Sequence, residues 1–497
     1  MNHREGQRAG SRATFMKTMT LLALMSFILN GLILFPESHA CTHICLKPGE
    51  EIVLGYNYDW FFYDAFIIIN KRDVQKMALV TGAGRPARWI SRYGSVTFNQ
   101  YGKEFPNGGM NEKGLVICPA WLDDTEYPSR DSGATLNELQ WIQYQLDNHG
   151  SVDEVIKSDS AVFIVPVFAN LRYFVVDASG KTAIIEFLNG KMVVHSGEAL
   201  PHGVGTNSTY ARSVKYLENP NRLQSAPKWS SLNRFKTAAE LLKKYYFDES
   251  RPGLNAVDYA FNVLSEVSTG ITRWTIVFDL KKLRISYRTS EQKPIKEIDL
   301  SSFNFDPNTA VQTIDMNNFY SGDISGRFHD YSPELNRNLI MKTCRKLGLA
   351  FTDEELEALS RYQWTLESSG SPVQSFEKTG KLVVSVTGTK DDIGDVELVL
   401  FNSRENFEKM CPVRMGEVSV LDGIARWVVY NLPFGEYAIT AYHDENGNMK
   451  IDRGVFGIPK EPLGFSNNVR IFFKMPRFEK VKFDLNSKEK TIHIRLK

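Results

Sequence analysis

The N-terminal forty residues are the most constraining feature of the sequence, because their pattern sets where the folded, mature chain is expected to begin. Basic residues precede an apolar run from Met19 to Phe35, and Ser38 and Ala40 then place small side chains at the third and first positions before Cys41. A basic start, an apolar middle and a small-x-small end are typical of a cleaved signal peptide. We therefore assign residues 1–40 to a signal peptide and expect the mature chain to begin at Cys41.

Other interpretations of this segment stay open. The apolar run is near the roughly 17-residue minimum for a membrane span, so it could remain as an uncleaved anchor. Lipidation of Cys41 is less favoured, since Ser38 stands where lipoproteins usually carry Leu. Translation from Met16 would give a signal of more usual length. The favoured interpretation predicts an exported protein, periplasmic or extracellular, with no stable membrane span after processing.

The whole-chain composition excludes several classes. With 497 residues the chain is too long for one ordinary domain. Its formal net charge of +1 gives no basic footprint for nucleic acid. Five cysteines are too few for a disulfide-dense fold, and the odd number leaves at least one unpaired. A free thiol at a new N-terminus therefore requires a functional explanation.

The stretch 41–305 mixes strands with helices. Asn189-Gly190 between apolar runs is a strong hairpin signal within an expected three-stranded meander over 171–195. Helical spacing of apolar residues recurs over 235–246 and 257–267. Several strands in sequence with helices between them favour α+β layers with antiparallel sheets.

The rest of the chain divides in two. Residues 306–375 are polar, with helix candidates at 333–347 and 353–362, and are predicted to be a helical connector. Strand patterns with intervening turns return over 376–497 and predict a small all-β sandwich domain.

Cys41 and Asp59 form the first candidate site. An N-terminal cysteine carries its own base, because an α-amine has a pKa near about 7.7–8.0 and is partly neutral at pH 7. That amine can take the thiol proton and later protonate a leaving amine, while Asp59 accepts a hydrogen bond from it. The ordinary alternatives are a small buried side chain for Cys41 and a turn or cap residue for Asp59.

Six segments, in order, carry a family resemblance. They are Cys41-Thr42 with Gly55-Tyr56-Asn57-Tyr58-Asp59-Trp60, Gly109 to Leu115, Asp177 to Leu188, Thr206-Asn207-Ser208, Ser231-Leu232-Asn233-Arg234-Phe235, and Trp274 to Asp279. Together they resemble the choloylglycine hydrolase family, which includes bile salt hydrolases and penicillin V acylases. The resemblance implies a four-layer αββα N-terminal-nucleophile hydrolase domain that cleaves small-molecule linear amides through an acyl-enzyme thioester. It implies no cofactor for catalysis and is compatible with a homo-oligomer.

The resemblance also implies roles for single residues. Cys41 is the expected nucleophile, Asp59 orients its amine, Asn207 donates an N–H to the oxyanion, and Arg234 tunes the thiol. An Asn amide is a neutral donor, and a guanidinium stays charged and lowers the pKa of a nearby thiol. The alternatives are a helix cap for Asn207 and a solvated charge for Arg234.

Two positions depart from the family pattern, and both are candidate substrate or oxyanion residues. Tyr56 stands where the family usually has Arg, which removes one cation near the thiol. Trp121 stands where Asn or Tyr is common, so it either offers only its main-chain N–H or shapes an aromatic acyl pocket. Tyr56 keeps an alternative function open, namely a weakened or inactive amidase scaffold that acts as a ligand-binding or surface module.

The last candidate site lies near the C-terminus. Asp444, Asn446, Asn448 and Asp452 place oxygen side chains at alternating loop positions, with Gly447 relieving the turn, which is a pattern that Ca²⁺ accepts. The alternative is a polar turn between strands. The surrounding segment also resembles a small bacterial domain of uncharacterised function, a resemblance that implies no chemistry.

Overall fold

A computed structural model describes most of the chain after the expected signal peptide. The described residues are 40–79, 85–129, 133–218, 226–247, 254–347, 352–362, 379–452, 459–469 and 475–497. The signal-peptide prediction falls outside them, except for Ala40. Among the described residues, no helix combines the length and the apolar character that crossing a membrane requires.

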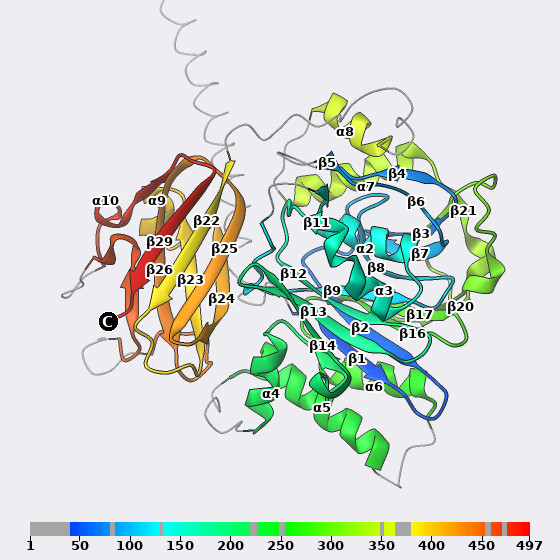
Figure 1. Cartoon of the computed structure of the whole chain (residues 1–497), viewed down its shortest axis with the longest axis horizontal. Helices are drawn as coiled ribbons and strands as arrows, with labels where there is room; N and C mark the ends of the chain where they lie inside the picture. Colours follow the sequence, from blue (N-terminus) through cyan, green and yellow to red (C-terminus); the bar gives the residue numbers. More distant parts are fainter. Residues whose placement is uncertain are drawn as a thin grey trace, which may run out of the picture.

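Two large sheets form the centre of the first domain (Figure 1). The seven-stranded sheet has the order β15 (Val204–Gly205), β1 (Thr42–Leu46), β2 (Val53–Asp59), β16 (Thr272–Asp279), β17 (Arg284–Thr289), β18 (Lys296–Asp299) and β20 (Gly322–Asp323). The nine-stranded sheet has the order β14 (Lys191–Ser196), β13 (Thr182–Leu188), β12 (Leu171–Val176), β9 (Val116–Trp121), β8 (Pro106–Asn111), β7 (Ser95–Asn99), β3 (Phe66–Asn70), β19 (Gln312–Asp315) and β21 (His329–Asp330).

Helices cover the outer face of each sheet. On the seven-stranded sheet lie α4 (Tyr210–Glu218), α5 (Ser231–Phe247) and α6 (Ala256–Glu266). On the nine-stranded sheet lie α2 (Glu138–Asn148) and α3 (Val152–Lys157). One apolar core joins the two sheets and continues under α5 and α6, and a second core fills the space beneath α2 and α3. This arrangement confirms the predicted four-layer αββα fold.

Five further short strands of the first domain form two small sheets. They are β5 (Arg85–Pro86), β10 (Ala134–Leu136) and β11 (Val162–Ile164) in one, and β4 (Gln75–Met77) and β6 (Arg88–Ile90) in the other.

The predicted meander is present as β12, β13 and β14. Its second turn uses left-handed backbone at Asn189 (φ 52°) and Gly190 (φ 71°). Those two residue types adopt that conformation at low cost, which explains why the dipeptide predicted the hairpin. The two helices expected over 235–246 and 257–267 are α5 and α6.

The sheets of the first domain continue beyond residue 305, into the stretch that was expected to be helical connector. Strand β19 lies between β3 and β21 in the nine-stranded sheet, and β20 pairs with β18 at the edge of the other sheet. These strands are short and polar, so the sequence pattern does not predict them, and they are identified only by their pairing in the structure. The helical part begins later, with α7 (Pro333–Lys346) and α8 (Asp353–Ser360).

The C-terminal β domain, Thr379–Lys497, confirms the all-β prediction. Its strands follow the order β27 (Leu463–Phe465), β26 (Gly435–Asp444), β23 (Asp395–Phe401), β24 (Arg414–Leu421), β25 (Ile424–Pro433), β22 (Thr379–Thr387) and β29 (Glu489–Arg495), with β28 (Phe483–Leu485) on β26 and short helices α9 (Arg404–Glu408) and α10 (Phe478–Val481). The sheet curls until its ends meet, since Leu463 and Lys497 exchange two main-chain hydrogen bonds of 3.2 Å. Its interior is apolar.

The C-terminal β domain packs against the first domain through β24 and β25 (Figure 1). Arg426 on β25 holds Glu126 with two hydrogen bonds, of 2.6 and 2.8 Å. Asn170 donates to the main-chain oxygen of Val428 at 3.0 Å. The two domains therefore share a specific polar interface that involves the segment just after β9.

Candidate active site

Cys41 and Asp59 lie at the same end of two paired strands. Cys41 immediately precedes β1, Asp59 ends β2, and the antiparallel register places Thr42 opposite Asn57. Both residues are buried, with 5% of Cys41 and 1% of Asp59 exposed. The strand pair thus brings together the two residues that the sequence separates by a hairpin.

The Asp59 carboxylate is only half satisfied. Its Oδ2 accepts a 3.3 Å hydrogen bond from Thr269, whereas Oδ1 has no partner among the residues that the structure describes. Burial raises the pKa of Asp59 to about 6, and the positive charge of Arg234 opposes that shift. A buried acceptor without a donor is unusual and identifies this carboxylate as a place where a cation or N–H group would be stabilised.

Arg234 connects three parts of the site. It projects from α5 and is 2% exposed, so it is not a solvated surface charge. Its Nη1 donates to the main-chain oxygen of Cys41 at 2.8 Å and to Thr42 Oγ1 at 2.6 Å. Its Nη2 donates to Asn207 Oδ1 at 2.9 Å. The rigid fork of a guanidinium can hold these groups together, which an ammonium group cannot do as well.

Asn207 lies just after β15 and links Arg234 to Trp121. Its Nδ2 donates a 3.0 Å hydrogen bond to the main-chain oxygen of Trp121. The side chain therefore bonds within the site and does not cap α4. An amide nitrogen carries two hydrogens, so Asn207 retains a second N–H for another acceptor.

Trp121 is the last residue of β9 and stands in an aromatic group. Its ring centroid is 6.2 Å from that of Trp60 and 6.0 Å from that of Phe168. Its indole N–H donates to Asp123 at 2.8 Å. Trp121 is partly exposed, and its main-chain oxygen contacts the Asn207 amide.

Tyr56 occupies the space beneath the thiol. Its hydroxyl oxygen is 3.9 Å from Cys41 Sγ, and its side chain is fully buried. The ring stacks on His43, with centroids 4.6 Å apart and an interplanar angle of 5°. Tyr56 therefore contacts the sulfur from the protein interior, without presenting a surface to solvent.

The Cys41 thiol is not ionised at neutral pH while its nitrogen is in a peptide bond. Burial, followed by the negative charge of Asp59, raises its pKa to about 11. Hydrogen bonds from the Asp59 main chain and from Tyr56, and the charge of Arg234, act in the opposite direction. Activation of this sulfur requires a further base or cation.

Comparison with known sequences now identifies the first domain. Residues 41–247 match the profile of the linear amide C-N hydrolases, choloylglycine hydrolase family. The chain carries a choloylglycine hydrolase family domain. Residues 384–493 match a second profile, that of an uncharacterised protein family conserved in bacteria (DUF2141). Both assignments confirm the resemblances seen in the sequence.

Two penicillin V acylases agree with the choloylglycine hydrolase assignment. The penicillin V acylase of Pectobacterium atrosepticum is 28% identical over 313 residues, which is 52% of this chain and 81% of that protein. The solved penicillin V acylase of Agrobacterium tumefaciens superposes with a TM-score of 0.51 at 25% identity, over 59% of this chain and 98% of that one. A mutant conjugated bile acid hydrolase of Clostridium perfringens gives a TM-score of 0.48 at 20% identity, over 57% and 98%.

The calcium prediction for the C-terminal loop is not supported. In the described part of the chain, no group of three His, Cys, Asp or Glu side chains is placed to hold a metal ion. The loop oxygens bond within the loop instead: Asp444 accepts the main-chain N–H groups of Gly447, Asn448 and Met449. The side-chain N–H groups of Asn446 and Asn448 are directed at Asp452. The alternating pattern thus forms a self-capped polar turn.

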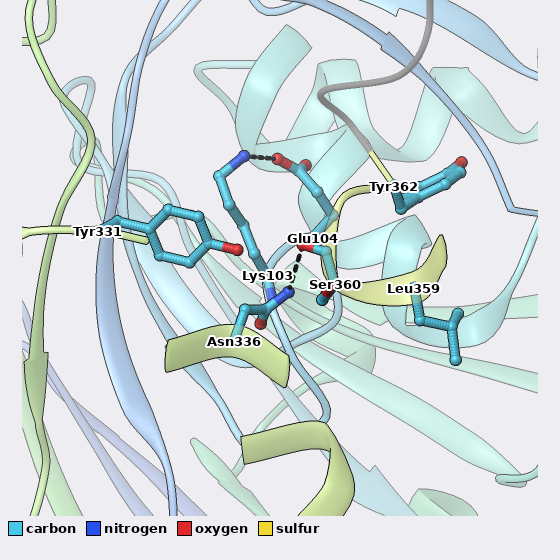
Figure 2. A pocket seen from close by; sticks show the side chains of 7 residues that line it. All are labelled: Lys103, Glu104, Tyr331, Asn336, Leu359, Ser360 and Tyr362. Carbon is cyan, nitrogen blue, oxygen red and sulfur yellow. Dashed lines mark hydrogen bonds and ion pairs between the residues drawn. The ribbon is translucent and has the colours of Figure 1, made fainter. Parts of the chain in front are cut away.

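A small pocket lies away from the candidate active site, where α7 and α8 pack on the loop between β7 and β8 (Figure 2). Its polar lining includes Lys103 and Asn336, which are joined by a 2.9 Å bond to the Lys103 main-chain N–H. Glu104 is engaged by Lys103 and, on the buried side, by Lys76. The charges in this pocket are therefore paired, and the bond from the Lys103 main chain to Asn336 attaches α7 to this loop.

Three further residues take part in the site without a sequence signal. His43 stacks on Tyr56, Thr269 donates to Asp59, and Asp123 accepts the indole N–H of Trp121. The contacts of Thr269 and Asp123 depend on loops distant in sequence from Cys41. All five cysteines lie in the described part of the chain and none is in a disulfide.

Proposed function

We propose that the mature protein is an exported amidase whose nucleophile is Cys41, freed by cleavage after Ala40. The buried Asp59 Oδ1, which has no hydrogen-bond partner among the described residues, carries this proposal. Cleavage would create an α-ammonium next to this end of the β1–β2 pair, which is the donor that the carboxylate lacks. The new charge would also lower the pKa of the thiol, because a nearby cation favours the thiolate.

The chemistry follows from these groups. The neutral α-amine takes the proton of the thiol while the sulfur bonds to the carbonyl carbon of the amide, and the C=O electron pair moves to oxygen. The second N–H of Asn207 donates to that oxyanion. Collapse breaks the C–N bond, and the α-ammonium protonates the leaving amine. Water then attacks the thioester, the sulfur recovers its proton through the amine, and a carboxylic acid leaves.

The aromatic group around Trp121 favours an amide with an aromatic acyl group. The ring centroids of Trp60 and Trp121 are 6.2 Å apart and those of Trp121 and Phe168 are 6.0 Å apart, and Trp121 is the residue whose main-chain oxygen accepts from Asn207. Aromatic pairs of this kind bind a flat acyl group well. Two relatives are penicillin V acylases, and penicillin V is therefore the first substrate to test.

Two measurements test the proposal. Intact mass of the exported protein should correspond to a chain that begins with an unmodified Cys41, in the periplasm or the medium. The purified chain should release the side-chain acid from penicillin V, Cys41→Ala should abolish this, and Cys411→Ala should leave it unchanged as a matched cysteine control. A mature chain that retains residues before Cys41, or carries a lipid on it, would contradict the mechanism.

A second candidate function is a ligand-binding module without turnover. The observation that favours it is Tyr56, which fills the space beneath Cys41 with a neutral ring. The two functions differ in one measurement. A binding module would retain penicillin V or a bile-salt amide unchanged on the wild-type protein, whereas an amidase would form a Cys41 adduct heavier by the acyl group.

A further inference from the structure

Asp123 and Asp124 lie beside the part of strand β24 that is not paired with β25, in the sheet of the C-terminal β domain. Strand β24 pairs with β23 along most of its length but with β25 only at Val420 and Leu421. Before Val420, the N–H groups of Glu417 and Ser419 donate instead to Asp123 Oδ2 at 3.2 Å and to Asp124 Oδ1 at 2.9 Å. The two carboxylates thus satisfy donors that a neighbouring strand would otherwise satisfy.

Asp123 differs from Asp124 in its second contact. The other oxygen of Asp123, Oδ1, accepts the indole N–H of Trp121 at 2.8 Å. The other oxygen of Asp124 turns back to the hydroxyl of Ser419 at 3.4 Å, so it stays within the domain interface. Asp123 therefore joins the C-terminal β domain to an active-site residue, and Asp124 does not.

From Trp121 the connection continues to the nucleophile. Its main-chain oxygen accepts from Asn207 at 3.0 Å. Asn207 accepts from Arg234 at 2.9 Å, and Arg234 donates to the main-chain oxygen of Cys41 at 2.8 Å. Five consecutive bonds thus run from Glu417 in one domain to Cys41 in the other.

We infer that Asp123 is a positioning residue, through which strand β24 of the C-terminal β domain fixes Trp121 and the Asn207 amide. On this basis the C-terminal β domain is a structural part of the amidase site. The expected effect on kcat rests on the proposed function, whereas the hydrogen bonds of Asp123 are present whether or not the protein turns over a substrate. The Asn207 N–H stabilises a developing oxyanion only while it is correctly oriented. Loss of the hydrogen bond between Asp123 and Trp121 would loosen that orientation and so lower the rate.

The matched pair Asp123→Asn and Asp124→Asn, in the full mature chain, tests the inference. Each change replaces a carboxylate with an amide of the same size, so one of the two acceptor oxygens becomes a donor and one of the residue's hydrogen bonds is lost. Asp123→Asn should lower kcat by about tenfold or more, with a smaller change in KM. Asp124→Asn should change kcat by less than about twofold. Equal losses in the two variants would reduce Asp123 to a docking residue and overturn the inference.

Two further measurements separate positioning from stability. Trp121→Phe removes the indole N–H and keeps a ring, so its effect on kcat should not add to that of Asp123→Asn. Hydrogen exchange of peptides covering 116–122 and 204–209 should accelerate in Asp123→Asn and not in Asp124→Asn. Hydrogen exchange needs no substrate, so it tests the positioning role separately from the proposed function. If the wild-type chain cleaves no amide, the proposed function fails. If hydrogen exchange is unchanged in Asp123→Asn, the positioning role is overturned.

Discussion

Arg234 Nη1 donates a 2.8 Å hydrogen bond to the main-chain oxygen of Cys41, although 193 positions separate the two residues. The other terminal nitrogen of the same guanidinium holds Asn207. One buried group therefore sets the position of the expected nucleophile relative to the expected oxyanion donor.

Replacing Arg234 with Lys should break at least one of its hydrogen bonds, either to the main-chain oxygen of Cys41 or to Asn207. A lysine has one nitrogen and cannot meet both the Cys41 oxygen and Asn207 Oδ1 with the geometry of the fork. We expect kcat/KM to fall about 100-fold and the melting temperature to fall as buried acceptors lose their donor. Arg284→Lys, at a site where the side chain is 49% exposed, is the control. Wild-type kcat/KM in Arg234→Lys would mean that the bridge is dispensable.

Asp59→Asn should stabilise the unprocessed chain while it impairs the amidase. The folded-state pKa of Asp59 is raised to about 6 from an ordinary value of 3.8, so the folded state binds more protons between these values. This carboxylate therefore destabilises the chain increasingly as pH rises from about 4 to 7, by about 3 kcal/mol at neutral pH. Unfolding free energies of wild type and Asp59→Asn should converge near pH 4 and diverge above it. A pH-independent difference would show that Asp59 does not titrate in this range.

Asp59→Asn should also slow turnover in the mature chain, because a neutral amide stabilises the α-ammonium less. We expect kcat to fall at least tenfold with the fold intact by circular dichroism. A variant that is more stable and equally active would remove Asp59 from the mechanism.

Tyr56 provides a test of the thiol environment. Tyr56→Phe keeps the stack on His43 and removes the hydroxyl 3.9 Å from Sγ, so the rate of Cys41 alkylation should fall only a few-fold. Tyr56→Arg should shift the alkylation midpoint to lower pH, because a cation favours the thiolate. It should also destabilise the chain by several kcal/mol, because the position is fully buried. An unshifted midpoint in Tyr56→Arg would mean that the new charge does not face the sulfur.

Asp444 should behave as a capping residue and not as a calcium ligand. It accepts three main-chain N–H groups and is 1% exposed, so Asp444→Ala should destabilise the protein by about 2 kcal/mol or more. Calcium at about 1 mM should leave the melting temperature of wild type unchanged. A rise that Asp444→Ala abolishes would restore the metal interpretation.

Local patterns predicted those parts of the fold whose conformations depend on neighbouring residues. Asn189-Gly190 predicted its hairpin because both residues adopt left-handed backbone readily, and α5 and α6 were expected from their apolar spacing. Strands β19 and β20 had no such pattern, because they are short and polar and depend on pairing with strands distant in sequence. The alternating oxygens of Asp444 to Asp452 were ambiguous, since the same residues bind a cation or cap a turn.

By itself, the sequence determined the identities of the groups in the candidate site and the layers that hold them. Cys41, Asp59, Asn207 and Arg234 follow from ordered motifs. Only the tertiary structure decided that one Asp59 oxygen has no partner in the described part of the chain, that Tyr56 lies beneath the thiol, and that Asp123 joins the two domains. The physical reason is that burial and hydrogen-bond satisfaction are properties of contacts between segments distant in sequence, which no local spacing of residues encodes.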